Sequence, residues 1–459
     1  MTREKIEEIK AKQKAYFSEG RTLSYESRIE ALGKLYSAIE KYSDELRDAL
    51  MSDLGKSAAE SDMCEIGLTL SEITYLRKHL KGWMREKRVR TPLAQFASRS
   101  FTRALPYGNT LIMSPWNYPV LLTLEPLADA LAAGNTAIIK PSAYSPASSS
   151  ILKKLIEETF DEGLAALIEG GREENASLLD LDFDYIFFTG SKEVGKLVMA
   201  KAAEHLTPLT LELGGKSPCI ITKNADLALS ARRTAFGKLI NCGQTCVAPD
   251  YILVERSVKA EFENLLRKEV VRMTGENPLE NPEYGKIINI KHFSRIIKLL
   301  DESKTILGGR YDASTLKIEP TILTDVTKDD RVMQEEIFGP VFPILTYESI
   351  DECIDYINGG DHPLALYIFT SDRKEAAHVM THTLFGGGCI NDTLIHLATS
   401  EMSFGGVRQS GMGGYHGKSG FESFSHYTSI VDKKTWIDLP MRYRPYTERN
   451  RRLINFFLK

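Results

Sequence analysis

Short apolar runs alternate with helical segments along this chain from about residue 105, and this rhythm restricts its fold more than any other feature. The runs 110–113, 136–139 and 185–189 are β-branched or apolar, and a helix opened by Pro119 and closed by Gly134 stands between the first two. Such runs predict strands buried on both faces, as in a parallel sheet covered by helices. The sequence therefore predicts an α/β fold with a doubly wound, Rossmann-like sheet, which binds ligands beyond the carboxyl ends of its strands.

Other segments extend this pattern. A second α/β stretch starts near residue 217, with strands expected at 219–222, 251–255, 341–345 and 364–369 and helices at 226–239 and 257–272. The first eighty residues are expected to be helical, with Ser24 as an N-cap and an apolar stripe from Met63 to Trp83 that faces the core. Residues 87–103 contain Pro92 and alternating basic residues, typical of a connector or an exposed hairpin arm, and 424–431 has the pattern of a strand.

Composition excludes several classes of protein. The 459 residues are enough for two or three domains, and 42% apolar residues rule out a disordered chain. With 58 basic against 62 acidic residues, no partner nucleic acid is expected. The N-terminus is charged from its third residue, and Glu125 and Asp129 interrupt the most apolar stretch, so neither a secretory signal nor a membrane span is expected. Six cysteines are too few for a disulfide scaffold and suit no metal site, so a reducing, cytoplasmic location is expected.

Two short segments carry residue types suited to catalysis. Residues 241–246 (NCGQTC) place cysteine on a polar, glycine-containing loop, where a thiolate nucleophile would lie near backbone N–H groups. Glu212 stands between leucines at a strand end, where desolvation raises a carboxyl pKa towards that of a usable general base. Taken alone, the cysteine is more often a buried structural residue, and the glutamate more often a salt-bridged strand end.

Three further loops have features of a binding site. Asn117 lies between two prolines in SPWNYP, so its amide could donate to a developing oxyanion. Glu336 and Phe338, in EEIFGP, suit ribose hydroxyls and a flat ring, although Phe338 equally suits a core. Residues 190–195 follow a strand and begin a helix, where backbone N–H groups can receive a phosphate, but their spacing is not the usual dinucleotide fingerprint.

All five segments occur together and in one order, and in this the chain resembles the aldehyde dehydrogenase superfamily, most closely its class 3 (fatty and aromatic aldehyde) branch. The resemblance runs from about residue 20 to residue 450. Its markers are PWNYP at 115–119, KPS at 140–142, FTGSKEVG at 188–195, LTPLTLELGGKSP at 206–218, NCGQTCVAPDYIL at 241–253, EEIFGP at 335–340 and FGGVRQSGMGGYHGK at 404–418.

The resemblance implies oxidation of aldehydes to carboxylic acids with NAD or NADP as cofactor, through a thiohemiacetal and a thioester on the enzyme. It makes Cys246 the nucleophile, Glu212 the general base, and Asn117 the oxyanion hole together with the backbone N–H of Cys246. It implies cofactor contacts at Lys140, Gly190, Ser191, Lys192, Glu193, Val194, Gly195, Glu336 and Phe338. It implies a pocket for medium-chain or aromatic aldehydes at Tyr118, Ile395 and His396, and it requires no metal.

The family fold implies three parts and a tail. An NAD(P)-binding domain is expected from residues 1–83 and 104–212, and a catalytic domain from 213–411. A small β bridging element is expected from 84–103 and 412–434, followed by a C-terminal tail at 435–459. Because paired arms of this kind cover their edges against a second subunit, we expect a homodimer.

Three other functions compete with this interpretation. A CoA-acylating relative would pass its thioester to coenzyme A, and Glu212 argues against that. A thiol hydrolase would also use Cys246, but no histidine stands in a recognisable partner motif. A non-catalytic binding protein derived from the fold would have lost Cys246 or Glu212, and both are present.

One departure from the family pattern concerns the cofactor. Many NAD-preferring relatives carry a glutamate three residues after the strand-end lysine, where its carboxylate accepts from the adenosine ribose. Here Ala143 stands at that position after Lys140, so both that hydrogen bond and the repulsion of a 2′-phosphate are absent. The sequence therefore predicts that NADP is accepted at least comparably to NAD.

Overall fold

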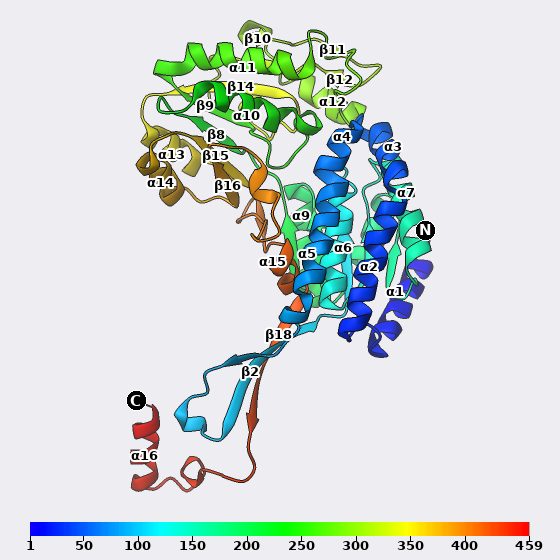
Figure 1. The fold of residues 1–459 in the computed structure, drawn as a ribbon, viewed down its shortest axis with the longest axis vertical. Helices are drawn as coiled ribbons and strands as arrows, with labels where there is room; N and C mark the ends of the chain where they lie inside the picture. The colour runs from blue at the N-terminus through cyan, green and yellow to red at the C-terminus, as the bar shows by residue number, and fades with distance from the viewer. Residues whose placement is uncertain (459) are drawn as a thin grey trace.

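The computed structural model describes residues 1–458, which form two α/β units and a long β arm (Figure 1). The first unit holds a six-stranded sheet in the order β17-β7-β6-β3-β4-β5, parallel except for β17 at its edge. Its strands are β3 (Asn109–Met113), β4 (Thr136–Lys140), β5 (Ala165–Leu167), β6 (Tyr185–Thr189), β7 (Leu209–Glu212) and β17 (Gly411–Met412). The predicted doubly wound sheet is confirmed.

The second unit holds a seven-stranded sheet in the order β10-β13-β14-β9-β8-β15-β16, parallel except for the β10–β13 pair. Its strands are β8 (Pro218–Ile221), β9 (Tyr251–Glu255), β10 (Thr305–Leu307), β13 (Thr321–Leu323), β14 (Val341–Tyr347), β15 (Ala365–Phe369) and β16 (Gly387–Ile390). The four strands expected in this stretch are therefore β8, β9, β14 and β15. A separate hairpin pairs β11 (Tyr311–Asp312) with β12 (Lys317–Ile318).

Helices cover both faces of each sheet, because successive strand residues point to opposite sides and both sides are apolar. The first unit has α1 (Arg3–Ser18), α2 (Tyr25–Lys41), α3 (Ser43–Leu54), α4 (Ala58–Ser61), α5 (Gly67–Trp83), α6 (Leu121–Ala133), α7 (Pro146–Thr159), α8 (Arg172–Leu179) and α9 (Lys192–His205). The second unit has α10 (Leu227–Leu239), α11 (Lys259–Thr274), α12 (Ile290–Ile297), α13 (Ile350–Asn358) and α14 (Arg373–His382). Helix α6 is buried on every side and ends at Gly134, whose φ of 92° is left-handed.

Two expectations about the first helices have different outcomes. Ser24 is the N-cap of α2, and its side chain accepts from the Ser27 N–H at 3.0 Å, as predicted. The prediction that Met63 faces the core is wrong, because its side chain is 50% exposed. A π-helical turn, η1 (Asp62–Ile66), precedes α5 and rotates the stripe, so Met63 leaves the buried face while Ile73 stays on it.

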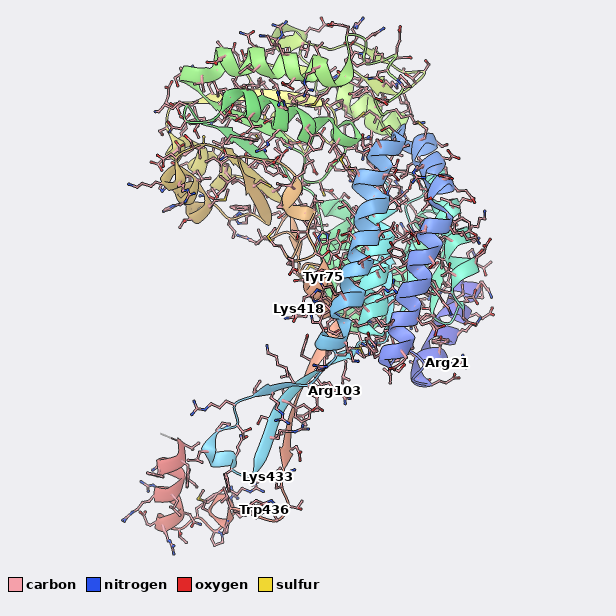
Figure 2. The ribbon with its side chains drawn as sticks, viewed as in Figure 1. Arg21, Tyr75, Arg103, Lys418, Lys433 and Trp436 are labelled. Carbon is pink, nitrogen blue, oxygen red and sulfur yellow. The ribbon has the colours of Figure 1, made fainter. Side chains whose placement is uncertain are left out.

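The predicted hairpin arm is confirmed, and it stands clear of both units (Figure 1). It is a three-stranded antiparallel sheet of β1 (Lys87–Val89), β2 (Ser98–Pro106) and β18 (Ser425–Lys433), with α15 (Gly417–Ser423) leading into β18. At its tip, helix α16 (Glu448–Leu458) packs on the short turn η2 (Leu93–Gln95). Figure 2 shows Lys433 and Trp436 at this end of the arm. Within residues 1–458, no helix combines the length and the apolar character needed to cross a membrane.

Candidate active site

The loop from residue 241 to residue 250 joins α10 to β9 and carries two cysteines. Asn241 and Cys242 have left-handed backbones, with φ of 49° and 52°, and Gly243 follows with φ of 72°. A Cβ on Gly243 would lie 2.3 Å from the Gly339 carbonyl oxygen, so only glycine fits this turn. The tight turn brings the two cysteines to different surroundings.

Cys242 is buried in an apolar cluster of the second unit that includes Tyr284 and Ile337. Cys246 is half-buried and packs against the main core instead, in the cluster that includes Phe404 and Tyr415. Burial raises the pKa of the Cys246 thiol to about 12, helped by the charges of Glu336 and Glu212, while the backbone N–H groups of Cys246 and Val247 oppose the rise. The thiol is therefore protonated at neutral pH in the chain alone.

Glu212 ends β7, as the sequence predicted, and its side chain is 2% exposed. Neither carboxylate oxygen has a hydrogen-bond partner among residues 1–458, and burial raises the pKa of this carboxyl well above its ordinary value. When this carboxyl is charged, it also raises the pKa of the Cys246 thiol, so the two groups lie near each other. A buried carboxyl with a raised pKa is a candidate general base.

Asn117 reaches the cysteine loop from the opposite side. Its Nδ2 donates to the Gln244 carbonyl oxygen at 3.1 Å, and its own carbonyl oxygen accepts from Asn241 Nδ2 at 2.7 Å. A side-chain amide carries two N–H donors, and the bond to Gln244 uses one of them. Within residues 1–458, this bond leaves the second N–H of the Asn117 amide without a use.

The residues at 190–195 cap helix α9 and lie close to β7. Ser191 is the N-cap and accepts from the Val194 N–H, while the Gly190 N–H donates to the Glu212 carbonyl oxygen at 3.0 Å. A Cβ on Gly195 would lie 2.6 Å from the Leu213 side chain, so glycine lets the helix approach the strand. In the first turn of α9 the Val194 N–H is bonded to Ser191, which leaves the backbone N–H groups of Lys192 and Glu193 for a phosphate.

Two lysines of the expected cofactor site have partners in the structure. Lys140 Nζ donates to the carbonyl oxygens of Pro141 and Gly170, both at 2.7 Å, and burial lowers its pKa to about 8. Lys192 forms an ion pair with Asp361, which belongs to the second unit. This ion pair therefore links the start of α9 in the first unit to the loop before β15 in the second unit.

Glu336 and Phe338 lie on the loop before β14. The Glu336 carboxylate lies against Gly214, where a Cβ would be 2.2 Å from its Oε2, and burial raises its pKa to about 8. Phe338 has a left-handed backbone, with φ of 48°. The centre of its ring lies 5.4 Å from that of Trp116, and the two rings form a T-shaped pair. Arg295 Nη2 donates to the Ile337 carbonyl oxygen at 2.6 Å and holds this loop, which no sequence motif indicated.

The three expected pocket residues are not alike. Tyr118 is buried, and its hydroxyl is 2.6 Å from Thr245 Oγ1, directly beside Cys246. Ile395 is 55% exposed in the short turn η7 (Ile395–Leu397), whereas His396 points inward, with Nδ1 3.6 Å from Cys389 Sγ and a pKa lowered to about 4 by burial. Only Tyr118 contacts the cysteine loop through a hydrogen bond.

These groups fit a nicotinamide dinucleotide. A Cβ at Gly190, Gly195 or Gly214 would clash with Phe188, Leu213 or Glu336 respectively, so glycine allows close packing around the end of β7. The free N–H groups at the start of α9 suit a diphosphate, and the Glu336 carboxylate suits hydroxyl donors.

Comparison with known proteins agrees with this geometry. The model of the aldehyde dehydrogenase family matches residues 1–430. The chain belongs to the aldehyde dehydrogenase family. Over 446 residues it is 47% identical to the 4,4'-diaponeurosporen-aldehyde dehydrogenase of Staphylococcus aureus, covering 97% of each chain. Over 440 residues it is 42% identical to mouse aldehyde dehydrogenase family 3 member B1, covering 95% of this chain and 94% of the relative.

Solved structures of the family superpose closely on this chain. The substrate-bound state of Staphylococcus aureus AldH matches with a TM-score of 0.97 and 46% identity, covering 99% of both chains. The NAD⁺ complex of a Bacillus cereus aldehyde dehydrogenase matches with a TM-score of 0.85 and 27% identity, covering 94% of this chain and 89% of that one. The class 3 resemblance is confirmed by the family 3 relative, and the chain is an NAD(P)-dependent aldehyde dehydrogenase.

Proposed function

We propose that this enzyme oxidises hydrophobic aldehydes to carboxylic acids with Cys246 as nucleophile, Glu212 as general base and Asn117 as oxyanion donor. The observation that carries the proposal is the pairing of Asn117 with the Cys246 loop across the junction of the two units. The unpartnered Glu212 carboxyl beside the same thiol supports it. Cys242 faces a different cluster and is excluded from this role.

In the first step the Cys246 thiol gives up its proton to water, and its sulfur attacks the aldehyde carbonyl carbon. The free N–H of Asn117 and the backbone N–H of Cys246 stabilise the negative oxygen that develops, an effect worth most where water is excluded. Bound NAD or NADP supplies the hydride acceptor, held by the contacts proposed at 190–195, Lys140, Glu336 and Phe338. The acyl group then remains on Cys246 as a thioester.

Hydrolysis of that thioester is the task of Glu212. A raised pKa makes its carboxylate basic enough to take a proton from water as the water attacks the acyl carbon. The bond between the acyl carbon and the sulfur breaks, the carboxylic acid product leaves, and Cys246 is released as a thiolate or thiol. Without this base, the buried thioester would be long-lived.

The assignment of Cys246 is tested by substitution. Cys246→Ala should abolish dehydrogenase turnover, while Cys242→Ala, which removes the neighbouring thiol, should keep it. More than trace activity in purified Cys246→Ala would contradict the assignment. A product assay with and without coenzyme A separates the CoA-acylating alternative, which would release the acyl group to coenzyme A.

Apolar aldehydes are the proposed substrates, with a broad preference for medium-chain or aromatic members. Cys246 packs against the main core cluster, whose members include the buried aromatic residues Phe404 and Tyr415, and Tyr118 lies beside its loop. A pocket of this kind discriminates by only about 1–3 kcal/mol per methylene, which predicts breadth. A screen in which only charged semialdehydes react would contradict this preference.

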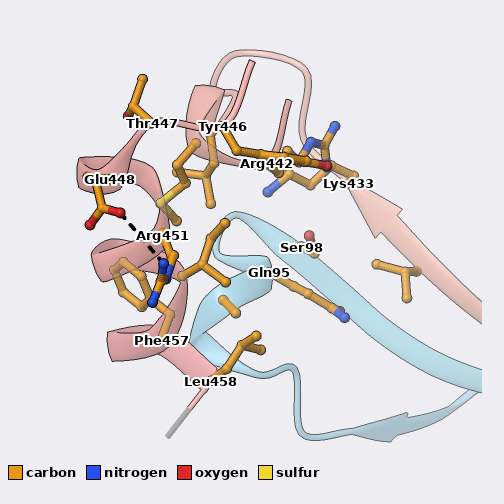
Figure 3. Close-up of a pocket in the computed structure, with 15 residues that line it drawn as sticks. Gln95, Ser98, Lys433, Arg442, Tyr446, Thr447, Glu448, Arg451, Phe457 and Leu458 are labelled. Carbon is orange, nitrogen blue, oxygen red and sulfur yellow. Dashed lines mark ion pairs between the residues drawn. The ribbon is translucent and has the colours of Figure 1, made fainter. Parts of the chain in front are cut away.

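We infer that the enzyme is a homodimer formed through its arm. The arm projects away from both units and exposes several apolar side chains, namely Val89, Leu93, Phe96, Val431 and Trp436. A cavity of about 840 Å³ lies at its tip beneath α16, lined by residues that include Gln95, Tyr446 and Phe457 (Figure 3). An isolated arm of this shape leaves strand edges open, which a second copy can cover.

Sedimentation tests the dimer. The wild-type chain should sediment as a dimer at micromolar concentration, and Phe96→Asp with Val431→Asp should shift it to a monomer. Leu206→Asp changes a side chain that is 89% exposed but lies off the arm, so it is the matched control. A monomeric wild-type enzyme would contradict the inference.

A cytoplasmic, reducing location is proposed from the cysteines. All six are free in the structure, and four of them are buried. Cell fractionation that places the activity outside the cytoplasmic fraction would contradict this location.

A further inference from the structure

Lys56 is a buried lysine in the turn between α3 and α4, below the loop that carries Asn117. Its ammonium donates to the Glu65 carboxylate at 2.5 Å and to the backbone carbonyl oxygen of Asn117 at 3.2 Å. It also lies 4.1 Å from the centre of the Tyr118 ring. The side chains of Lys56 and Glu65 are both 0% exposed, so this ion pair carries a desolvation cost that its contacts must offset.

Glu65 fixes the other side of the same loop. Its second carboxylate oxygen accepts from the Val120 N–H at 2.8 Å and from the Leu121 N–H at 3.3 Å. These N–H groups stand where the loop turns into α6. The pair of Lys56 and Glu65 therefore holds a carbonyl oxygen at Asn117 and the backbone three and four residues after it.

The same short segment also holds the cysteine loop. Glu60 accepts from the Asn241 N–H at 2.7 Å, at the residue whose φ of 49° is left-handed. Asn241 in turn donates to the Asn117 carbonyl oxygen, the atom that Lys56 contacts. On the other side of the loop, the Tyr118 hydroxyl meets Thr245. The segment 56–65 thus contacts both loops that meet at the active site.

We propose that Lys56 and Glu65 are positioning residues for Asn117. Lys56 fixes the Asn117 carbonyl and Glu65 fixes the start of α6, so the backbone of Asn117 is held on both sides. The direction of its free N–H follows from that backbone. The inference rests on the oxyanion role of Asn117 in the proposed function, and neither Lys56 nor Glu65 touches the substrate.

The test replaces the ion pair with a neutral pair of similar shape. Lys56→Met alone would leave the Glu65 carboxylate buried without its ammonium and could unfold the chain. The variant K56M/E65Q avoids this, because glutamine keeps an acceptor for the Val120 N–H. The exposed pair of Lys154 and Glu45, at 2.8 Å, supplies the matched control K154M/E45Q.

We expect K56M/E65Q to lower kcat by about 10²-fold, the effect of misplacing a catalytic group by about 1 Å. The dissociation constant of NADPH, measured by fluorescence titration, should change less than twofold. The isotope effect on kcat from an aldehyde deuterated at C1 should rise above that of the wild type, because hydride transfer, the step that breaks the C1–D bond, becomes rate-limiting. The control variant should keep the wild-type kcat and isotope effect.

A double-mutant cycle shows whether the pair acts through Asn117. Adding K56M/E65Q to Asn117→Ala should cause no further loss of kcat, because the group being positioned is already absent. Losses that multiply, or a K56M/E65Q enzyme with the wild-type kcat, would overturn the positioning role while the proposed function stands. An Asn117→Ala enzyme with the wild-type kcat would instead overturn the oxyanion role itself, and the inference with it.

Discussion

Asn117 and Asn241 form a hydrogen bond from one loop to the other, with Asn241 Nδ2 2.7 Å from the Asn117 carbonyl oxygen. Both side-chain amides also donate to the Gln244 carbonyl oxygen, at 3.1 Å from Asn117 and 3.0 Å from Asn241. The loop after β3 and the cysteine loop are thereby locked together two residues before Cys246. This joint fixes Asn117, the proposed oxyanion donor, relative to Cys246, the proposed nucleophile.

The first prediction concerns removal of the side-chain amide of Asn117, the proposed oxyanion donor. Asn117→Ala should lower kcat by about 10²–10³-fold, the usual cost of losing one oxyanion donor, when steady-state NADPH or NADH formation is followed. Asn358→Ala removes an exposed amide that donates to the His382 carbonyl oxygen at 2.7 Å and should leave kcat unchanged. Equal activities in the two variants would refute the oxyanion role.

Loss of the base should separate the two half-reactions. Glu212→Gln should give a rapid burst of reduced cofactor and then slow turnover, because the thioester forms but is hydrolysed slowly. Stopped-flow absorbance of the reduced cofactor measures both phases. If the burst itself disappears, Glu212 acts at an earlier step than proposed.

The same substitution should change stability in a pH-dependent way. The folded state raises the Glu212 pKa above its unfolded value, so the folded chain retains a proton that the unfolded chain loses. Wild-type stability therefore falls as pH rises above about 4.3, until the folded pKa is passed. Glu212→Gln does not titrate, so its Tm advantage over the wild type should grow from pH 5 to pH 8. An advantage that shrinks over this range would contradict the raised pKa.

We expect the choice between NAD and NADP to depend on the turn after β4. Ala143 is exposed there, and no carboxylate stands at that position to repel a 2′-phosphate. The Lys140 ammonium, near the same turn, could pair with the phosphate in exchange for a carbonyl partner. The wild type should accept NADP at least comparably to NAD, and Ala143→Glu should shift preference towards NAD. A wild-type kcat/KM for NADP more than about tenfold below that for NAD, or about 1.4 kcal/mol, would refute this.

The sequence predicted the strands well because each is a continuous apolar run with a clear boundary. The expected run 185–189 is β6 with the same limits, and 251–255 is β9. Short strands were missed, such as β5 at the edge of the first sheet and β13 between β10 and β14, because three residues carry too little pattern. The exposure of Met63 was missed because a π-helical turn leaves no mark in the apolar spacing.

The candidate site was only partly predictable for a related reason. Cys246, Glu212 and Asn117 stand in motifs that the family resemblance made recognisable. Lys56 stands in no motif, and the motif that contains Asn241 does not indicate its partner, since the contacts of these two residues span 61 and 124 positions. Arg295 likewise reaches a carbonyl 42 positions away. Such contacts depend on tertiary packing and cannot be inferred from local spacing.

In the proposed mechanism Cys246 carries the acyl group, and Glu212 activates the water that removes it. The most direct test uses the variant C242A/E212Q, which has one thiol on the loop and no base. The protein is mixed with a medium-chain aldehyde and NADP, quenched in acid within the burst, and digested for mass spectrometry. We expect one acyl group per chain, located at Cys246. A chain that has reduced its equivalent of NADP but carries no acyl group on Cys246, or carries it on another residue, would show that Cys246 is not the nucleophile.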